Sequence, residues 1–150
     1  MSKKIVITGG IGYIGTELCK IYSGISWNNE ILVIDNRFIS ERVNQLRNWG
    51  IKFIHGDILD KELIKSHLSN IDIVHHLAGI TQVSRTAKES NFKEDEKINQ
   101  VAIDGTQNVI SSIPNSCKII FPSTHVVFEG KRDRDMEKDI EEDCEKSPVL

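Results

Sequence analysis

The fold is decided by the stretch Thr8-Gly9-Gly10-Ile11-Gly12-Tyr13-Ile14-Gly15, which follows a short apolar run and opens a segment with a helical pattern. A strand, a glycine-rich turn and a helix in this order form the fingerprint of dinucleotide-binding proteins. Gly9 allows the tight turn out of the strand, and Gly15 lets the helix pack closely on it. Gly12 has no Cβ, so a pyrophosphate can approach the backbone and meet the N–H groups that begin the helix. The stretch therefore predicts a phosphate-binding turn.

An acidic residue supplies the second signal for a dinucleotide. Asp35 ends the apolar run 31–34 and follows Gly15 by twenty residues. A carboxylate at the end of the second strand is placed to accept hydrogen bonds from the adenosine ribose hydroxyls. Each signal alone has a plainer interpretation, because glycine-rich turns also occur without nucleotides and Asp35 is compatible with a loop or helix-capping role. The two together favour dinucleotide binding.

Length and composition limit the remaining function classes. One hundred and fifty residues make one domain with a real core, and a net charge of -3 with a pI near 5.9 indicates neither a nucleic-acid nor a membrane partner. Cys19, Cys117 and Cys144 are odd in number and contain no C-x-x-C pair, so we expect reduced thiols rather than disulfides or a metal site. No segment resembles a signal peptide or a membrane span, and we therefore expect a cytoplasmic protein.

Apolar runs alternate with amphipathic segments along the chain. This alternation predicts an α/β fold, a doubly wound parallel sheet (Rossmann fold) that stops after about the fifth strand. The predicted strands are 4–8, 30–35, 51–55, 71–77 and 118–121, and the predicted helices are 13–23, 40–49, 61–68 and 92–111. The first helix is expected to bury Ile14, Leu18 and Ile21, and the last to bury Ile98, Val101, Ala102, Gly105, Val109 and Ile110.

Two segments break this alternation. Residues 78–91 are polar and follow a strand's carboxyl end, which fits either a ligand-facing loop or a plain surface loop. Residues 129–146 are dominated by charged side chains and predict a solvated loop with one short exposed helix, with a functional acidic patch as the alternative. His75 and His76 lie within a predicted strand and are interpreted as filled strand positions rather than catalysts.

Several motifs occur together in one order along the whole chain. They are T-G-G-x-G-Y-I-G (8–15), Asp35-Asn36, Gly56-Asp57-Ile58, His76-Leu77-Ala78-Gly79, Gly105-Thr106-x-Asn108 and Phe121-Pro122-Ser123-Thr124. In this combination the chain resembles the N-terminal half of an extended short-chain dehydrogenase/reductase of the NAD-dependent epimerase/dehydratase type. The resemblance implies NAD as cofactor. It also implies residues 1–128 as the NAD-binding domain, with 129–150 as a charged loop leading toward a missing catalytic helix and substrate domain.

The resemblance also implies roles for individual residues. Tyr13 and Ile14 would lie over the pyrophosphate, Asp35 and Asn36 would hold the adenosine ribose, and Asp57 and Ile58 would flank the adenine. Residues 77–81 would run along the ribose and nicotinamide. The implied cofactor-binding set is Gly9, Gly12, Tyr13, Ile14, Gly15, Asp35, Asn36, Asp57, Ile58, Leu77, Ala78, Gly79 and Thr81.

Thr124 falls on the family's catalytic Ser/Thr position, where a hydroxyl can bridge a substrate hydroxyl and a tyrosine. Ala102 replaces a usual asparagine, and His125 and Val126 replace the acidic pair of the dehydratases, which counts against 4,6-dehydration. The family's Tyr-x-x-x-Lys pair has no counterpart, because the only tyrosines are Tyr13 and Tyr22.

The sequence thus predicts the NAD-binding part of a nucleotide-sugar epimerase/dehydratase-type oxidoreductase. The parent enzyme would oxidise a sugar carbon by hydride transfer to NAD, and epimerase, reductase and decarboxylase chemistry all stay open. The expected partner of the full-length parent is a nucleotide-sugar or other small-molecule substrate, and a homodimer of the parent is compatible with the resemblance. The alternative is a non-catalytic dinucleotide-binding sensor or interaction module.

Overall fold

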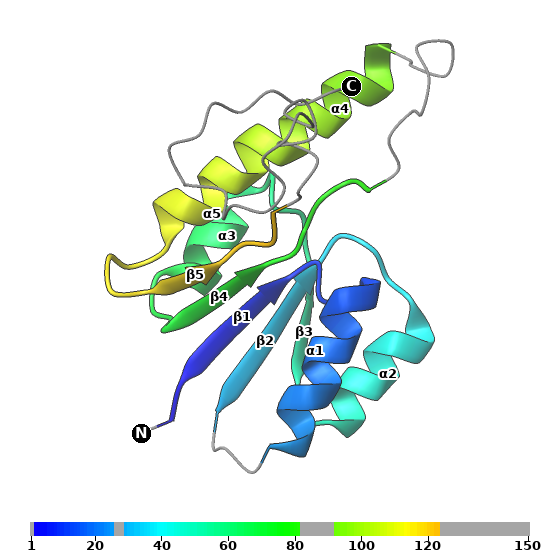
Figure 1. Ribbon diagram of the computed structural model, residues 1–150, viewed down its shortest axis with the longest axis vertical. Coiled ribbons are helices and arrows are strands. Elements are labelled where there is room, and N and C mark those ends of the chain that lie inside the picture. Colours follow the sequence, from blue (N-terminus) through cyan, green and yellow to red (C-terminus); the bar gives the residue numbers. More distant parts are fainter. Residues whose placement is uncertain (1, 26–28, 82–91, 124–150) are drawn as a thin grey trace, which may run out of the picture.

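The computed structural model describes residues 2–25, 29–81 and 92–123. The chain forms an α/β fold around a five-stranded parallel sheet with strand order β3-β2-β1-β4-β5 (Figure 1). The strands are β1 (Lys4–Thr8), β2 (Glu30–Asp35), β3 (Lys52–His55), β4 (Ile73–His76) and β5 (Lys118–Ile120). The helices are α1 (Tyr13–Gly24), α2 (Ser40–Asn48), α3 (Lys61–Leu68), α4 (Phe92–Gln100) and α5 (Thr106–Ser112), with a π-helical turn, Val101–Gly105, between the last two. The predicted Rossmann-like fold and its element order are confirmed.

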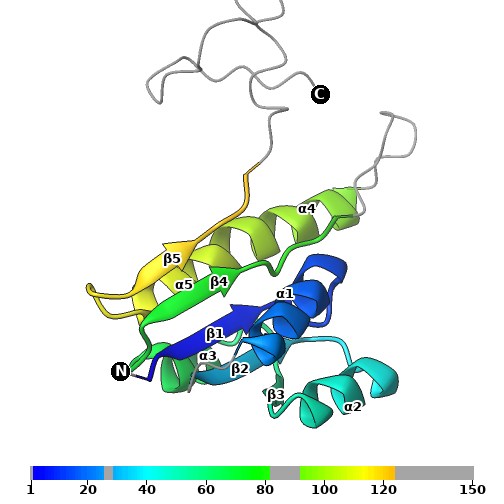
Figure 2. The same ribbon diagram turned by 60° about the horizontal axis from the view of Figure 1, so that its bottom comes forward.

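Helices cover both faces of the sheet, as Figures 1 and 2 show. On one face α1 and α2 pack through Cys19 and Leu46 onto alternate residues of β1 and β2, such as Ile7 and Val33. On the other face α3 and α5 pack onto the residues between, and this second core includes Val6, Ile34 and Val74 together with Ile64, Leu68 and Val109. The alternation of Val6 and Ile7 between the two cores is the two-residue period of a strand that is buried on both sides.

Strand order places the turn after β1 at a topological switch point. β2 and β3 lie on one side of β1, whereas β4 and β5 lie on the other. In the parallel register Thr8 is opposite Ile34 of β2 and opposite His76 of β4. Ligands of open α/β sheets bind in the crevice outside the carboxyl ends of strands at such a point. The fold therefore brings the glycine-rich turn and the ends of β2 and β4 together.

The predicted buried face of α1 was wrong at Ile14 and Ile21, whereas Leu18 is partly buried and packs against the core as predicted. Ile14 and Ile21 are 61% and 58% exposed, whereas Gly15 and Cys19 are buried. The cause is the close approach of the helix to the preceding turn: a Cβ on Gly15 would lie 2.6 Å from the Gly10 Cα. The face nearest the sheet therefore carries small residues, and the larger isoleucines point elsewhere.

The long helix predicted over 92–111 is interrupted by the π-helical turn Val101–Gly105. Val101, Gly105 and Val109 are buried as predicted, but Ala102 and Ile110 are exposed, which corrects the expected apolar face. A π turn holds an extra residue, so side chains beyond it are rotated relative to a regular helical pattern. Gly105 allows the close packing here, since a Cβ on it would lie 2.4 Å from the Ile58 Cδ1 atom.

The described residues leave several expectations open. No helix among them is long and apolar enough to cross a membrane, and no cluster of metal-ligating side chains occurs in the same part of the chain. Thr124, His125 and Val126, together with the charged segment 129–146, lie outside the described residues. The division into 1–128 and 129–150 therefore stays a prediction.

Candidate cofactor-binding site

The glycine-rich turn is wedged between the ends of β2 and β4. Gly9 has φ +70°, a conformation in which side chains are strained, and its N–H donates to the Ile34 carbonyl at 2.8 Å. A Cβ on Gly9 would lie 2.7 Å from the Ala78 nitrogen, which follows β4. A Cβ on Gly10 would lie 2.5 Å from a Val33 methyl group. Two adjacent positions thus require glycine, and sequence reasoning had singled out only Gly9.

Gly12 begins helix α1 as its N-cap residue, with extended backbone angles and no side-chain cap among the described residues. The Thr16 hydroxyl donates to the Gly12 carbonyl at 2.7 Å and fixes the first turn. A Cβ on Gly12 would point into space bounded by the Gly9 carbonyl at 3.1 Å and the Arg37 Nη2 at 3.5 Å. Uncapped N–H groups and the positive end of the helix dipole make this helix start a candidate anion site.

Tyr13 and Ile14 border this anion site from the first turn of α1. Their side chains are 82% and 61% exposed, so they are free to cover a molecule bound there. Gly15 keeps the helix start against the turn, as described above. The arrangement can hold a phosphate against the backbone with two apolar surfaces beside it.

Asp35 lies at the end of β2 with only 4% of its surface exposed. Its Oδ2 atom accepts from the Ile11 N–H at 3.2 Å and from Arg37 Nη2 at 3.3 Å. Its Oδ1 atom accepts from the Arg37 N–H at 3.0 Å and Nε at 3.2 Å. The carboxylate therefore connects the glycine-rich turn to the end of β2.

Asn36 and Asp57 lie together at the outer end of the site. The Asn36 side-chain amide donates to Asp57 Oδ2 at 2.9 Å, and Asp57 Oδ1 accepts from the Leu59 N–H at 2.9 Å. Ile58 is buried against Gly105. Asp35, Asn36 and Asp57 thus form one polar edge across the ends of β2 and β3, which offers hydrogen-bond acceptors and donors to a bound molecule.

The segment after β4 forms the other side of the site. The Leu77 N–H donates to the Thr8 carbonyl at 3.0 Å, and Ala78 contacts Gly9. Gly79 and Thr81 are exposed. All the sequence-predicted cofactor residues thus lie along the carboxyl edge of the sheet, and their roles toward a cofactor stay predictions.

A buried hydrogen-bonded chain, which sequence reasoning missed, crosses this edge. The Thr8 hydroxyl is 2.7 Å from His76 Nδ1, and His76 Nε2 is 3.0 Å from the Thr106 hydroxyl. Because Thr8 Oγ1 also accepts from the Ala78 N–H at 3.4 Å, its own proton is available to Nδ1, and we assign the hydrogen of the neutral ring to Nε2. Burial lowers the pKa of His76, which favours this neutral ring. The predicted structural role of His76 fits these contacts.

Tyr22 has the wrong surroundings for a catalytic base. Its hydroxyl is 2.8 Å from His75 Nε2, and the two rings make an edge contact with centroids 5.7 Å apart. Burial, followed by the nearby Cys19, raises the pKa of Tyr22, whereas a proton-abstracting tyrosine needs a lowered one. Tyr22 therefore belongs to the core around α1.

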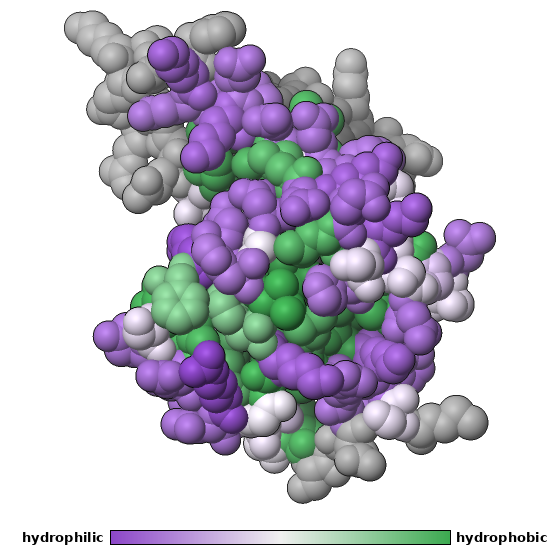
Figure 3. Space-filling view, turned by 180° about the vertical axis from the view of Figure 1, so that it is seen from behind, coloured by the Kyte–Doolittle hydropathy of each residue, from purple (hydrophilic) through white to green (hydrophobic). Residues whose placement is uncertain are grey.

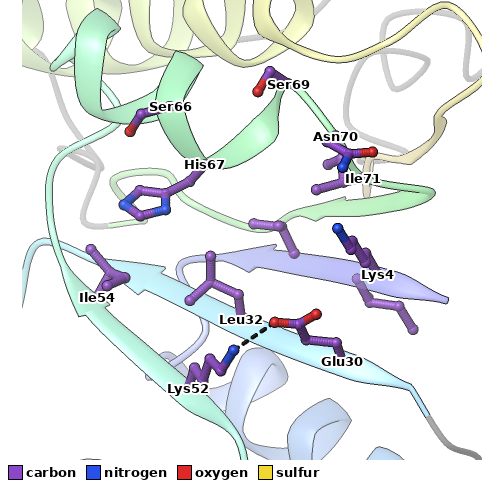
Figure 4. A pocket seen from close by; sticks show the side chains of 12 residues that line it. Lys4, Glu30, Leu32, Lys52, Ile54, Ser66, His67, Ser69, Asn70 and Ile71 are labelled. Atoms are coloured by element: carbon purple, nitrogen blue, oxygen red, sulfur yellow. Dashed lines mark hydrogen bonds and ion pairs between the residues drawn. The ribbon is translucent and has the colours of Figure 1, made fainter. Parts of the chain in front are cut away.

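A hollow lies at the opposite end of the sheet from these residues, between α3 and the amino ends of the strands (Figure 4). Its rim includes Lys4, the ion pair of Lys52 with Glu30, and His67, while Leu32 contributes to its apolar lining. Viewed from behind, the molecule shows hydrophobic residues among hydrophilic ones on this side (Figure 3). It contains none of the predicted site residues and lies away from the strand ends that bind ligands in α/β sheets.

Comparisons with known proteins agree with the geometry. The model of the 3-beta hydroxysteroid dehydrogenase/isomerase family matches residues 6–148. A dTDP-D-glucose 4,6-dehydratase of Dictyostelium discoideum is 34% identical over 134 residues, which cover 84% of this chain and 30% of that protein. A CDP-paratose 2-epimerase of Salmonella typhi is 31% identical over 134 residues, covering 83% of this chain and 38% of that protein.

A solved structure extends the likeness to three dimensions. UDP-glucose 4-epimerase from Brucella ovis in complex with NAD superposes with a TM-score of 0.74 at 21% identity, covering 98% of this chain and 42% of that one. At this identity the likeness establishes the fold alone. The chain spans about a third of the length of the curated relatives, from 30% to 38% in the two cases above.

Proposed function

The chain belongs to the extended short-chain dehydrogenases/reductases, and from this premise we propose that it is the NAD-binding part of a nucleotide-sugar epimerase/dehydratase-type oxidoreductase. The observation that carries the proposal is the pairing of two subsites at one switch point. The uncapped start of α1 at Gly12 suits a pyrophosphate, and the Asp35 carboxylate beyond it suits a ribose.

Each part of the site would contribute one function toward the cofactor. Gly12, Tyr13 and Ile14 hold and cover the pyrophosphate, while Asp35 with Asn36 and Asp57 orients the adenosine. Residues 77–81 line the path toward the nicotinamide, and the Thr124 hydroxyl orients a substrate hydroxyl. NAD, when bound, supplies the hydride acceptor for oxidation of a sugar carbon.

Calorimetric titration of the chain with NAD tests the proposal. Gly12→Val should abolish binding, because the added methyl groups occupy the space through which the pyrophosphate reaches the backbone. The matched control is Gly24→Val at the end of the same helix, where a Cβ would meet no atom within 4 Å. Undiminished binding by folded Gly12→Val would show that the turn is structural only.

The choice between NAD and NADP tests the role of Asp35. We expect tighter binding of NAD, since a carboxylate at the ribose repels a 2′-phosphate at close range. Arg37, whose Nε lies 3.2 Å from Asp35, softens this preference. Tighter binding of NADP in parallel titrations would remove Asp35 from the ribose subsite.

A dinucleotide-binding module without chemistry is the second candidate. One observation favours it: neither Tyr13 nor Tyr22 is followed by a lysine four residues later, so the chain contains no Tyr-x-x-x-Lys pair. The DNA that follows codon 150 discriminates the two candidates. A Tyr-x-x-x-Lys motif in frame within a few residues supports the oxidoreductase, and a stop codon at that point supports the module.

A further inference from the structure

All the acceptor positions of Asp35 are filled by protein donors. Each carboxylate oxygen receives one backbone N–H, from Ile11 or Arg37, and one N–H of the Arg37 guanidinium. An ionised carboxylate offers about four lone-pair sites, so these four bonds saturate it. A ribose that hydrogen-bonds to Asp35 must therefore displace one of these donors.

The guanidinium of Arg37 is the donor that can leave. The two backbone N–H groups are fixed, because Ile11 is fully buried in the glycine-rich turn and the Arg37 backbone continues from β2. The Arg37 side chain is 54% exposed, whereas that of Asp35 is 3% exposed. A long, half-exposed side chain exchanges partners at a much lower cost than a buried backbone does.

The Arg37 guanidinium also lies beside the proposed pyrophosphate position at Gly12. Arg37 Nη2 is 3.5 Å from the position of a Cβ on Gly12, which is the space where a pyrophosphate would meet the backbone. Within the first turn of α1 there is no acidic residue to compete for it. Arg42, the other arginine at the turn, already donates to the Ile11 carbonyl. Arg37 is therefore the guanidinium available to a phosphate, which it can bind through two parallel N–H groups.

We propose that Arg37 is an exchangeable counter-ion of the nucleotide site, which gives up Asp35 to the ribose and binds the pyrophosphate instead. The inference rests on the proposed dinucleotide function and deepens it. It has an unusual consequence, because one side chain opposes the ribose contact and supports the phosphate contact. A ligand with the ribose alone and a ligand with both ribose and pyrophosphate should therefore respond in opposite directions to the removal of Arg37.

The experiment compares adenosine, ADP and NAD on the full chain and on Arg37→Met. Adenosine should bind about threefold to tenfold more tightly to Arg37→Met, since its ribose no longer competes with a guanidinium, whereas ADP and NAD should bind about tenfold more weakly. Arg37→Lys should regain most of the ADP affinity through its charge. Arg47→Met, an arginine in the last turn of α2, is the control for loss of one positive charge and should change none of the three.

Several outcomes overturn the inference. If adenosine and ADP both weaken in Arg37→Met, Arg37 merely orders Asp35, and if neither changes, it takes no part in binding. Either result with NAD still bound by the original chain leaves the proposed function intact. If the original chain binds none of the three ligands, the proposed function and this inference both fall. Should Arg37→Met not fold, Arg37→Leu replaces it with the same expectations, and unchanged adenosine and ADP affinities there contradict the exchange.

Discussion

The two halves of the sheet on either side of β1 are covered by the rest of the chain to different degrees. In the β1-β2-β3 half, α1 and α2 cover the strands, and the polar groups at the strand ends bind one another through Asp35, Asn36 and Asp57. In the β4-β5 half, every residue of β5 is exposed, and Phe121 beyond it is 57% exposed. In the π-helical turn between α4 and α5, Ile103 is 66% exposed.

This difference in coverage suggests that cofactor binding and catalysis depend on different halves of the sheet. The side of the site that we propose for the adenosine is assembled from contacts within residues 8–59, so we expect it to bind on its own. The side that we propose for the nicotinamide lies along the segment after β4. The half that we propose to recognise the adenosine is therefore more fully covered than the half with β4 and β5.

The largest expected effect is a complete absence of turnover. The 150-residue chain should bind NAD yet convert no sugar nucleotide, because Thr124 can orient a hydroxyl but cannot remove its proton, and Tyr22 is held in the core. Incubation with NAD and a panel of sugar nucleotides, followed by NADH absorbance and sugar analysis, measures this. Turnover above background would mean that His125 or another residue supplies the base.

The next effect contrasts one glycine from each half. Gly9→Val should lower the free energy of unfolding by roughly 2 to 5 kcal/mol, because a side chain at φ +70° is strained and would overlap Ala78. Gly79→Val, where a Cβ would meet no atom within 4 Å, should change stability by less than about 0.5 kcal/mol. Denaturant unfolding of both variants gives the comparison, and equal losses would contradict it.

A smaller effect concerns the contact that joins the halves, from Thr8 through His76 to Thr106. Thr106→Val leaves the His76 Nε2–H without its acceptor and should cost about 1 to 3 kcal/mol. Ser111→Ala, an exposed hydroxyl on the same helix, is the control. Thermal unfolding of the two variants measures the difference, and an equal shift would show that the histidine needs no partner in α5.

His76 and its neighbour His75 give the stability of the protein a pH dependence. Burial lowers the pKa of His75 and His76 from the ordinary 6.5, so the unfolded chain binds protons at a higher pH than the folded chain does. Stability is fully present above about pH 6.5 and falls as the pH drops through that value toward the lower folded pKa. Proton resonances of the His75 and His76 rings that titrate at 6.5 in the folded chain would remove this dependence, and a titration above 6.5 would reverse its sign.

The smallest effect on stability comes from the exposed apolar residues. Ile103→Lys should change the free energy of unfolding by less than about 0.5 kcal/mol but reduce self-association. The substitution removes exposed apolar surface from the less covered half, which contains β4 and β5. Ile21→Lys on α1, where Ile21 is 58% exposed, should change association less. Sedimentation velocity across a concentration series compares the two, and an equal or larger effect of Ile21→Lys would break the distinction between the halves.

Local patterns carried most of the fold. Alternating apolar runs predicted every strand to within two residues at each end. The buried face of α1 could not be predicted from periodicity, because the close approach of Gly15 to Gly10 overrides it. The π turn packs against Ile58, far away in the sequence, and no local pattern predicted it.

The sequence predicted where the candidate site lies better than it predicted the contacts within the site. Glycine spacing and Asp35 located it, but the saturation of Asp35 by Arg37 depends on a side-chain conformation that sequence does not specify. The bond between Thr8 and His76 joins residues 68 apart in the chain, and only the register of β1 with β4 brings them together. The role of Thr124 stays a prediction.

Because of the π turn Val101–Gly105, the number of residues in this segment determines the directions of the side chains that follow it. Each residue of an α-helix advances the side-chain direction by about 100°. Removing one residue, such as Ile103, would let 92–112 run as a single regular helix, but Thr106 would then enter with a different angle toward β4. A one-residue insertion or deletion in this helix therefore has a different effect from one in a surface loop. It would rotate Thr106 about the helix axis and move its hydroxyl away from His76 Nε2.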